Sequence, residues 1–275
     1  MFIPMAVAIA EARVGKRGER IYSSRVPQLL ERGFIAFKSS TYMMVLSGFI
    51  EPVLYLLSFG YGIGTLLPTI EVGNETIKYA AFIAPALLAT SAMNGAIYDS
   101  TMNVFFKLNH DRIYQGMLST SMGPLDVALG EIGWALIRGF AYACTFMAVI
   151  APLGLVVSAW GLLAIPAAVL IAFGFASCGM AITSYMKSFQ QLEIVNIILL
   201  PMFLFSGSFY PVSVFPVWLQ NIVNLLPLTH AVNLIRGLCL GHINLALAGH
   251  AMYFIVMIIG GLFFTTKRLN ALFMK

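Results

Sequence analysis

Residues 191–241 read QLEIVNIILLPMFLFSGSFYPVSVFPVWLQNIVNLLPLTHAVNLIRGLCLG, and this stretch decides the fold. No charged residue occurs between Glu193 and Arg236, so the stretch is too apolar for a solvated loop. Three prolines between residues 211 and 227 break it too often for one long helix. Irregular backbone of this kind is tolerated at membrane depth only where it packs in protein or lines a cavity. We therefore predict one span followed by a pair of short re-entrant or interfacial helices.

The first of these short helices is predicted over residues 216–226. Trp218, Ile222 and Leu226 recur there at helical spacing and give one apolar face. The alternative is a single further span over residues 212–240. The prolines and several polar side chains within that range disfavour it.

The composition indicates a membrane protein with several spans. Of the 275 residues, 60% are hydrophobic and only 10% are charged, whereas a soluble chain carries about 25% charged residues. The formal net charge of +5 does not indicate a nucleic-acid partner, because the cations lie mostly between the spans and form no basic face. The three cysteines are odd in number and show no metal-binding spacing, so neither a disulfide framework nor a metal site is predicted.

Six segments are near the length of about 20 residues that crosses a bilayer, which predicts an all-α membrane domain. The predicted spans cover residues 40–63, 79–99, 127–150, 161–185, 190–209 and 247–266. Between the spans, thirteen Lys and Arg residues fall on one side and two, Lys78 and Arg236, on the other. Because cytoplasmic segments are enriched in these residues, we expect both termini in the cytoplasm.

The chain divides into three parts. Residues 1–38 form a cytoplasmic leader that ends in an amphipathic helix, residues 39–270 the transmembrane domain, and residues 271–275 a cytoplasmic tail. In the amphipathic helix, predicted over residues 22–38, the apolar side chains fall within an arc of about 140° and the charged ones lie opposite. Such a helix suits the membrane interface. The alternative is that the helix packs on a soluble domain, but this sequence contains no such domain.

Several charged residues lie within or at the ends of the predicted spans. Glu51, which precedes a proline, should face protein or a cavity, because a buried carboxylate in lipid costs about 2.5–3.5 kcal/mol. Arg138 lies two turns deeper than Glu131 and can reach back toward Glu131 or Asp126. We therefore expect a structural ion pair there, with a substrate site as the alternative. Asp99 closes the second span and is a further candidate for the transport path.

Alternating glycines end the first span, at Gly60, Gly62 and Gly64. They do not match a dinucleotide-binding fingerprint, because no strand precedes them and residue 65 is threonine. Small residues let helix backbones approach closely in a membrane. We expect these glycines at a dimer contact.

A long segment, residues 99–125, links the second and third spans on the cytoplasmic side. It is too polar to cross a membrane, yet it carries aromatic and aliphatic side chains. A short helix that docks on a cytoplasmic protein fits this mixture, and a helix resting on the membrane surface is the alternative. The residues that we expect to make the docking contact are Phe105, Lys107, Leu108, Asp111, Arg112, Ile113, Tyr114 and Met117.

The sequence contains no motif for energy coupling or catalysis. It has no phosphate-binding loop, no histidine pair at metal-ligand spacing and no nucleophile motif. We therefore predict neither an enzyme nor a cofactor in this chain. A separate protein must supply the energy.

Several stretches together resemble the permease subunit of type-2 ABC exporters, especially the nodulation lipo-oligosaccharide and daunorubicin-resistance branches. They are EPVLYLLSFGYGIG (51–64), YAAFIAPALLATSAMNGAIYDS (79–100), LGEIGWA (129–135), FASCGMAIT (175–183), LFSGSFYPVSVFP (204–216) and LPLTHAVNLIRGLCLGH (226–242). The resemblance implies an elbow helix before six spans, a coupling helix at residues 105–118 and re-entrant helices between spans five and six. A glutamate common in that coupling helix is Gln115 here.

The resemblance also implies partners and a location. It implies a second permease, identical or related, and two ATPase subunits that bind ATP and Mg²⁺, in the bacterial inner membrane. The cargo would be an amphipathic glycolipid, lipo-oligosaccharide or hydrophobic drug, moved outward. Two alternatives remain. An ion-coupled secondary transporter would be expected to show inverted repeats, which the spacing of the spans lacks. A membrane enzyme acting on lipid-linked sugars has only Asp99 and Glu131 as candidate acids.

Overall fold

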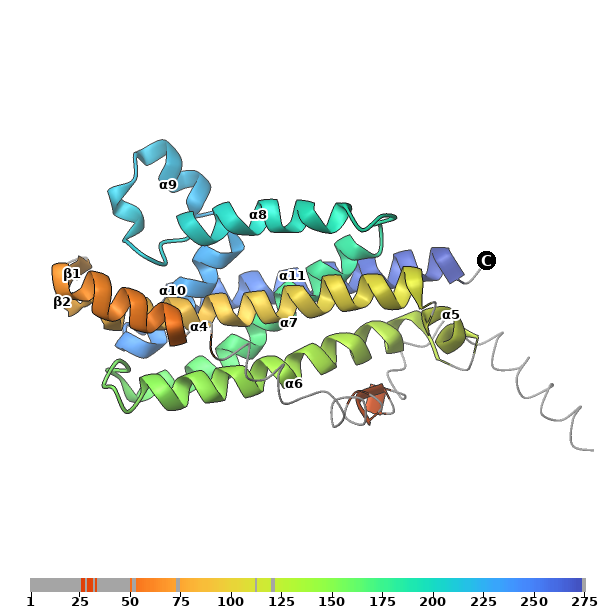
Figure 1. Cartoon of the computed structure of the whole chain (residues 1–275), viewed down its shortest axis with the longest axis horizontal. Helices are drawn as coiled ribbons and strands as arrows, with labels where there is room; N and C mark the ends of the chain where they lie inside the picture. Colours follow the sequence, from red (N-terminus) through yellow and green to blue (C-terminus); the bar gives the residue numbers. More distant parts are fainter. Residues whose placement is uncertain are drawn as a thin grey trace, which may run out of the picture.

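The computed structural model describes residues 26–27, 29–31, 33, 50, 53–72, 75–111, 113–119 and 122–273. The described chain is mostly helical (Figure 1). The leader, most of the predicted elbow helix and half of the first predicted span lie outside the described residues. So do two of the predicted site residues, Glu51 and Arg112.

Four described helices are long and apolar enough to cross a membrane: Tyr79–His110, Pro124–Ile150, Ala159–Thr183 and Leu245–Phe273. They correspond to the spans predicted at residues 79–99, 127–150, 161–185 and 247–266. Two further apolar helices are shorter, Val53–Leu66 and α8 (Gln191–Phe205). Among the described residues, therefore, the structure has four spans by length rather than the predicted six, or five if one bent helix pair is a span.

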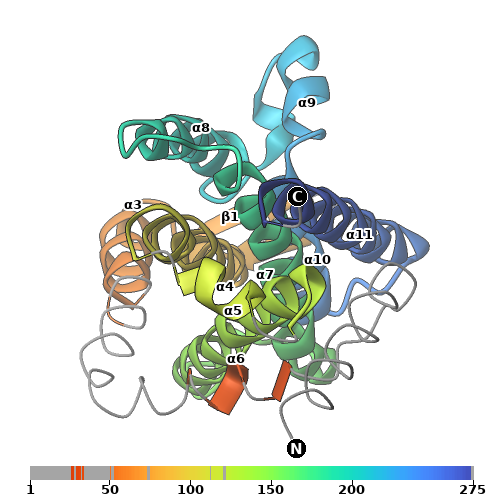
Figure 2. The same ribbon diagram turned by 90° about the vertical axis from the view of Figure 1, so that its right-hand side faces the viewer.

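Helix α7 (Ala164–Thr183) lies at the centre of the bundle. It packs against α4 (Tyr79–Tyr98), α6 (Pro124–Ile150) and α11 (Leu245–Phe273), and Figure 2 shows these helices around it. In a membrane no hydrophobic force drives helices together, so their association depends on close van der Waals packing, which small residues allow. A Cβ atom added to Gly261 of α11 would lie 2.5 Å from the backbone carbonyl carbon of Ser177 in α7.

Helix α4 is longer than the sequence predicted. It continues through the π-helical segments η2 (Asp99–Asn103) and η3 (Phe106–His110), so that one helical rod of 32 residues runs from Tyr79 to His110. The helix therefore continues eleven residues beyond the predicted end of the span at residue 99. After a bend at Asp111 comes the short helix α5 (Ile113–Leu118).

A small β-hairpin precedes α4, and the all-α prediction missed it. Strand β1 (Thr69–Val72) pairs antiparallel with β2 (Glu75–Lys78), with Thr69 opposite Lys78. The π-helical η1 (Ser58–Ile63) and the short α3 (Gly64–Leu66) precede it. β-Branched residues recur in both strands, which favours this pairing.

Residues 191–241 form separate helices, as predicted. After α8 come the 3₁₀ turn η5 (Val212–Val214), α9 (Val217–Val223) and α10 (Pro227–Leu240). Helices α9 and α10 meet at an angle of 84°. Residues 212–240 are therefore not one continuous helix, and the bent pair is either a re-entrant loop, as predicted, or the broken form of the alternative span. A second 3₁₀ turn, η4 (Ala159–Leu163), precedes α7 and packs against α10.

Arg236 of α10 fastens this region to the bundle. Its Nη2 donates to the carbonyl of Gly207 at 2.9 Å and its Nε to the carbonyl of Phe82 at 3.3 Å. The guanidinium carbon also lies 3.7 Å from the centre of the Phe82 ring, a favourable cation–π geometry. Gly207 has a φ of +73°, which a residue with a Cβ adopts only with strain. Arg236 therefore holds the turn after α8 against the start of α4.

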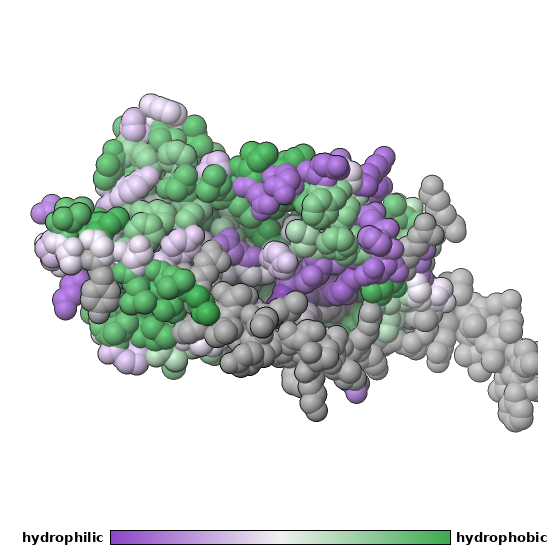
Figure 3. All heavy atoms as spheres, in the orientation of Figure 1, coloured by the Kyte–Doolittle hydropathy of each residue, from purple (hydrophilic) through white to green (hydrophobic). Residues whose placement is uncertain are grey.

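Apolar side chains cover much of the left part of the face in Figure 3, and hydrophilic ones gather in its right part. Comparison with Figure 1 places α5 and the end of α11 at that right-hand end. Along α11 the exposed large side chains are apolar, among them Val256, Ile259 and Phe263. This distribution fits a bundle whose sides face lipid.

The close packing of α7 and α11 yields a matched pair of substitutions. Gly261→Ala should force the two helices apart, and overpacking of this kind costs about 1–3 kcal/mol. Gly260→Ala is the control, because a Cβ atom there meets nothing within 4 Å. We expect the melting temperature in detergent to fall for Gly261→Ala alone. Equal melting temperatures for the two variants would contradict this packing.

Candidate functional site

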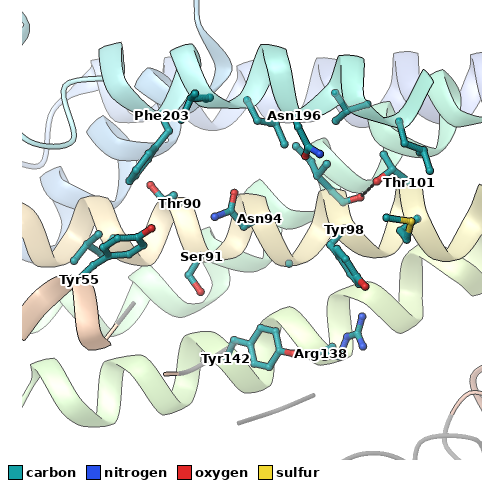
Figure 4. A pocket seen from close by; sticks show the side chains of 18 of the residues that line it. Tyr55, Thr90, Ser91, Asn94, Tyr98, Thr101, Arg138, Tyr142, Asn196 and Phe203 are labelled. Atoms are coloured by element: carbon teal, nitrogen blue, oxygen red, sulfur yellow. Dashed lines mark hydrogen bonds between the residues drawn. The ribbon is translucent and has the colours of Figure 1, made fainter. Parts of the chain in front are cut away.

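A cavity of about 800 Å³ lies between α4, α6 and α8 (Figure 4). Helix α8 makes only sparse contacts with the other described elements. Figures 1 and 2 both show it displaced from the bundle, so the cavity lies between a packed wall and a loosely held helix.

Helix α4 lines the cavity with a polar stripe. Ser91, Asn94 and Tyr98 follow at i, i+3 and i+7, which places them on one face of the helix. Asn94 and Tyr98 are exposed. Thr90 also borders the cavity, but its hydroxyl donates to the carbonyl of Ala86 at 2.9 Å. The stripe therefore offers uncharged groups that can donate and accept hydrogen bonds.

The facing wall is mostly aromatic and aliphatic. Helix α8 contributes Phe203, three leucines and one valine, together with the polar Asn196 and the acidic Glu193 near its start. The ring of Tyr55 lies 6.2 Å from that of Phe203, centre to centre, and Tyr142 of α6 borders the other side. The cavity therefore presents a mostly apolar wall, with Glu193 and Asn196 as its polar members, opposite the polar stripe of α4, a combination that suits an amphipathic ligand.

A buried ion pair closes the wall between α4 and α6. The Nε atom of Arg138 donates to Oδ2 of Asp99 at 2.8 Å, and Nη2 contacts Oδ1. Asn103 also donates to Oδ1 of Asp99, at 2.8 Å. Arg138 and Asp99 are only 8% and 6% exposed. Both were predicted as buried polar or transport-path residues, and Arg138 does line the cavity.

The predicted partners of Arg138 were wrong. Glu131 instead pairs with Lys107 of the α4 rod, with 2.5 Å between Nζ and Oε2. Asp126 accepts a hydrogen bond from the backbone of Gly123 at 3.0 Å and so caps the start of α6. The unexpected length of the α4 rod brings Lys107 alongside Glu131, and the packing of the rod on α6 brings Asp99 to Arg138.

Most of the predicted docking residues pack inside the chain. Phe105, Leu108 and Tyr114 are buried, and Ile113 and Met117 are partly buried against the core. Of the predicted charges, Lys107 is held by Glu131 and Asp111 is exposed. The exposed residues of this region that were not predicted are Phe106, Asn109, His110, Gln115 and Gly116.

A smaller cavity of about 360 Å³ lies beside α5. Gln115, Leu118 and Ser119 line it together with Leu272 and Phe273 from the end of α11. Helix α5 and the end of α11 thus form one surface at this end of the bundle.

The predicted contact glycines are not in tight contact within the described part of the chain. An added Cβ on Gly60 would meet Ala80 at 3.7 Å, and one on Gly64 would meet the carbonyl of Phe59 at 3.9 Å. Around Gly62 nothing lies within 4 Å. A helix of another molecule could therefore approach the backbone closely at these glycines.

Sequence reasoning missed the polar stripe of the cavity. The spacing of Ser91, Asn94 and Tyr98 was a usable signal, because small hydroxyl and amide groups on one face of an otherwise apolar span need a polar environment. No sequence pattern indicated that side chains of α8 line the cavity. Among the residues that the structure describes, no group of three or more potential metal ligands comes together.

Comparison with known proteins adds the family. Residues 25–240 match the family model described as ABC-2 type transporter. The chain is 30% identical to Nodulation protein J of Rhizobium leguminosarum bv. trifolii, over 87% of this chain and 90% of that protein. It is 31% identical to Nodulation protein J of Neorhizobium galegae, over 82% and 86%. It is also 25% identical to the probable multidrug ABC transporter permease YbhR of Escherichia coli, over 67% and 50%.

The ion pair at the cavity wall yields a stability prediction. Arg138→Leu leaves Asp99 buried without its counter-charge, and breaking a buried pair in this way costs about 3–5 kcal/mol. Arg138→Leu combined with Asp99→Asn removes that unpaired charge and should recover much of the loss. Lys187→Ala is the control, because that side chain is exposed and forms no ion pair with a described residue. The measurement is thermal unfolding in detergent, and a double variant no more stable than Arg138→Leu would refute the pair.

Proposed function

Because the chain belongs to the ABC-2 type transporter family, we propose that it is the membrane-spanning permease subunit of an ATP-driven exporter. Its cargo is an amphipathic molecule that moves outward across the bacterial cytoplasmic membrane. Members of this family are transport subunits rather than enzymes, and the ATP and Mg²⁺ belong to partner ATPases.

The observation that carries this proposal is the two-sided cavity. Ser91, Asn94 and Tyr98 can hydrogen-bond a polar head, while Phe203 and its neighbours on α8 accept an apolar part. A glycolipid or lipo-oligosaccharide fits this division, and so does a hydrophobic drug with a polar group. The name of one relative, a probable multidrug ABC transporter permease, supports the drug class, and the glycolipid class rests on the resemblance of the sequence to the nodulation lipo-oligosaccharide branch.

We place the second permease against α8 and the alternating glycines. The exposed side chains of α8 are large and apolar, among them Ile194, Ile197 and Leu200. Gly62 has open space around it, and small residues favour close approach of helices in membranes. A second copy or a related permease at this surface would then cover the part of the cavity that α8 does not cover.

We place two ATPase subunits at the end of the bundle that carries α5, which is then the cytoplasmic end. The α4 rod passes from the cavity to His110, so a force on its end reaches the cavity wall without crossing a loop. The predicted docking segment, residues 105–118, lies at that end. Because its apolar residues are largely buried, we expect docking through the exposed side chains and the hollow between α5 and α11.

Cargo recognition is tested at Asn94. Asn94→Leu keeps the volume but removes the hydrogen bonds of the exposed amide, so transport into inverted membrane vesicles should fall at least about tenfold. Asn221→Leu, a like substitution on the exposed part of α9, is the control. Both variants should retain ATP hydrolysis by the partner. Wild-type transport by Asn94→Leu would exclude this cavity as the cargo site.

Coupling is tested at exposed residues of the docking segment. The double variant Asp111→Lys and Gln115→Ala changes two side chains that the bundle does not bury, so membrane insertion should be unchanged. Loss of interface anchors commonly costs at least about 2 kcal/mol, and we expect the ATPase to be lost during co-purification. Glu71→Lys in the exposed hairpin is the control. An undiminished ATPase stoichiometry with normal export would move the docking site elsewhere.

A further inference from the structure

Two histidines from different helices face one another at the junction of α10 and α11. Nδ1 of His230 lies 2.7 Å from Nδ1 of His250, and the ring centres are 4.9 Å apart. His230 is in the first turns of α10, next to the 84° bend after α9, and His250 is in the second turn of α11. Both side chains are half-buried. Neither residue borders the transport cavity.

The surroundings fix the orientation of these rings. The ring of Tyr253 stacks on that of His230, with centres 4.2 Å apart and planes inclined by 23°. The Tyr253 hydroxyl in turn donates to the carbonyl of Leu225 at 3.3 Å. Metal-binding histidines are likewise held in a fixed orientation by contacts outside the metal's own ligands.

The separation of the two nitrogen atoms is close to what a shared metal ion needs. With bonds of 2.0–2.1 Å and tetrahedral angles, two nitrogen ligands of Zn²⁺ lie about 3.3 Å apart. The observed rings would therefore move apart by only about 0.6 Å to admit the ion. A neutral imidazole pair already aims one lone pair at the other ring, and imidazole nitrogen suits Zn²⁺ and Cu²⁺.

The geometry points to a two-histidine site for a divalent transition-metal ion, Zn²⁺ or Cu²⁺, that joins α10 to α11. His230 and His250 supply two ligands, and water supplies the others, since the described residues bring no third His, Cys, Asp or Glu to the pair. The bound ion would fasten the bent α9–α10 pair to the last span. Two protein ligands give a weak and exchangeable site rather than a permanent one.

Zinc titration of the purified full-length chain tests the site. After treatment with a chelator, the wild-type chain in detergent should bind one Zn²⁺ per chain in isothermal titration, and its melting temperature should rise with ZnCl₂. His230→Gln and His250→Gln should each weaken binding by at least about tenfold, because each removes a ligand. MgCl₂ should neither bind nor stabilise, since Mg²⁺ prefers oxygen ligands.

His242→Gln is the matched control. His242 lies 2.9 Å from Glu75 in an exposed contact and could hold zinc by itself. Unchanged binding in this variant supports the His230–His250 site. Loss of binding in His242→Gln but not in His250→Gln would overturn the proposal, and so would the absence of zinc binding by the wild type.

A second measurement avoids the variants altogether, in case they unfold. Cu²⁺ added to the wild-type chain should give an electron paramagnetic resonance spectrum with coupling to two imidazole nitrogens. A spectrum of solvated Cu²⁺, or coupling to a single nitrogen, would show that the two rings share only a hydrogen bond.

Discussion

Two ion pairs of opposite polarity hold the α4 rod against α6. In the first the acid, Asp99, is on α4 and the base, Arg138, on α6; in the second the base, Lys107, is on α4 and the acid, Glu131, on α6. The pairs are eight residues apart on the rod and seven on α6, or about 10–12 Å. If the helices slid by that distance, Asp99 would face Glu131 or Lys107 would face Arg138. Either arrangement is repulsive, so the two pairs fix the register of the helices.

The helices held in this register belong to a closely packed part of the molecule, and α8 makes few contacts with that part. Helices α4, α6, α7 and α11 pack closely through small residues such as Gly261, whereas α8 stands away from them. The cavity lies where the two parts meet, with its polar stripe on the fixed wall. A force applied beyond His110 would therefore move the wall as a unit relative to α8. In the proposed exporter, this division is the moving boundary, and it lies at the cavity that we propose as the cargo site.

The coarse architecture could be predicted from the sequence because a helix in lipid must be apolar along its length and is interrupted by proline. Apolar runs located the four long helices, and the prolines after residue 210 located the break into short helices. Sequence spacing could not assign the partner of Arg138, because the choice between Glu131 and Asp99 depends on where α4 ends. The segment after residue 99 is polar and contains π-helical turns, so no periodicity marked it as a continuation of the span. The cavity needed three helices in their places, and sequence patterns describe only one helix at a time.

The central claim is that α4 and α6 move together while α8 moves relative to them. Spin labels at residue 98 of α4 and residue 196 of α8 span the cavity, and labels at residues 98 and 140 span the ion-paired helices. The measurement is the distance distribution for each pair by double electron–electron resonance, in the complex with its ATPase, before and after trapping with ATP. The account predicts a shifted distribution for residues 98 and 196 and an unchanged one for residues 98 and 140. A shift between residues 98 and 140, with the distance across the cavity constant, would contradict it.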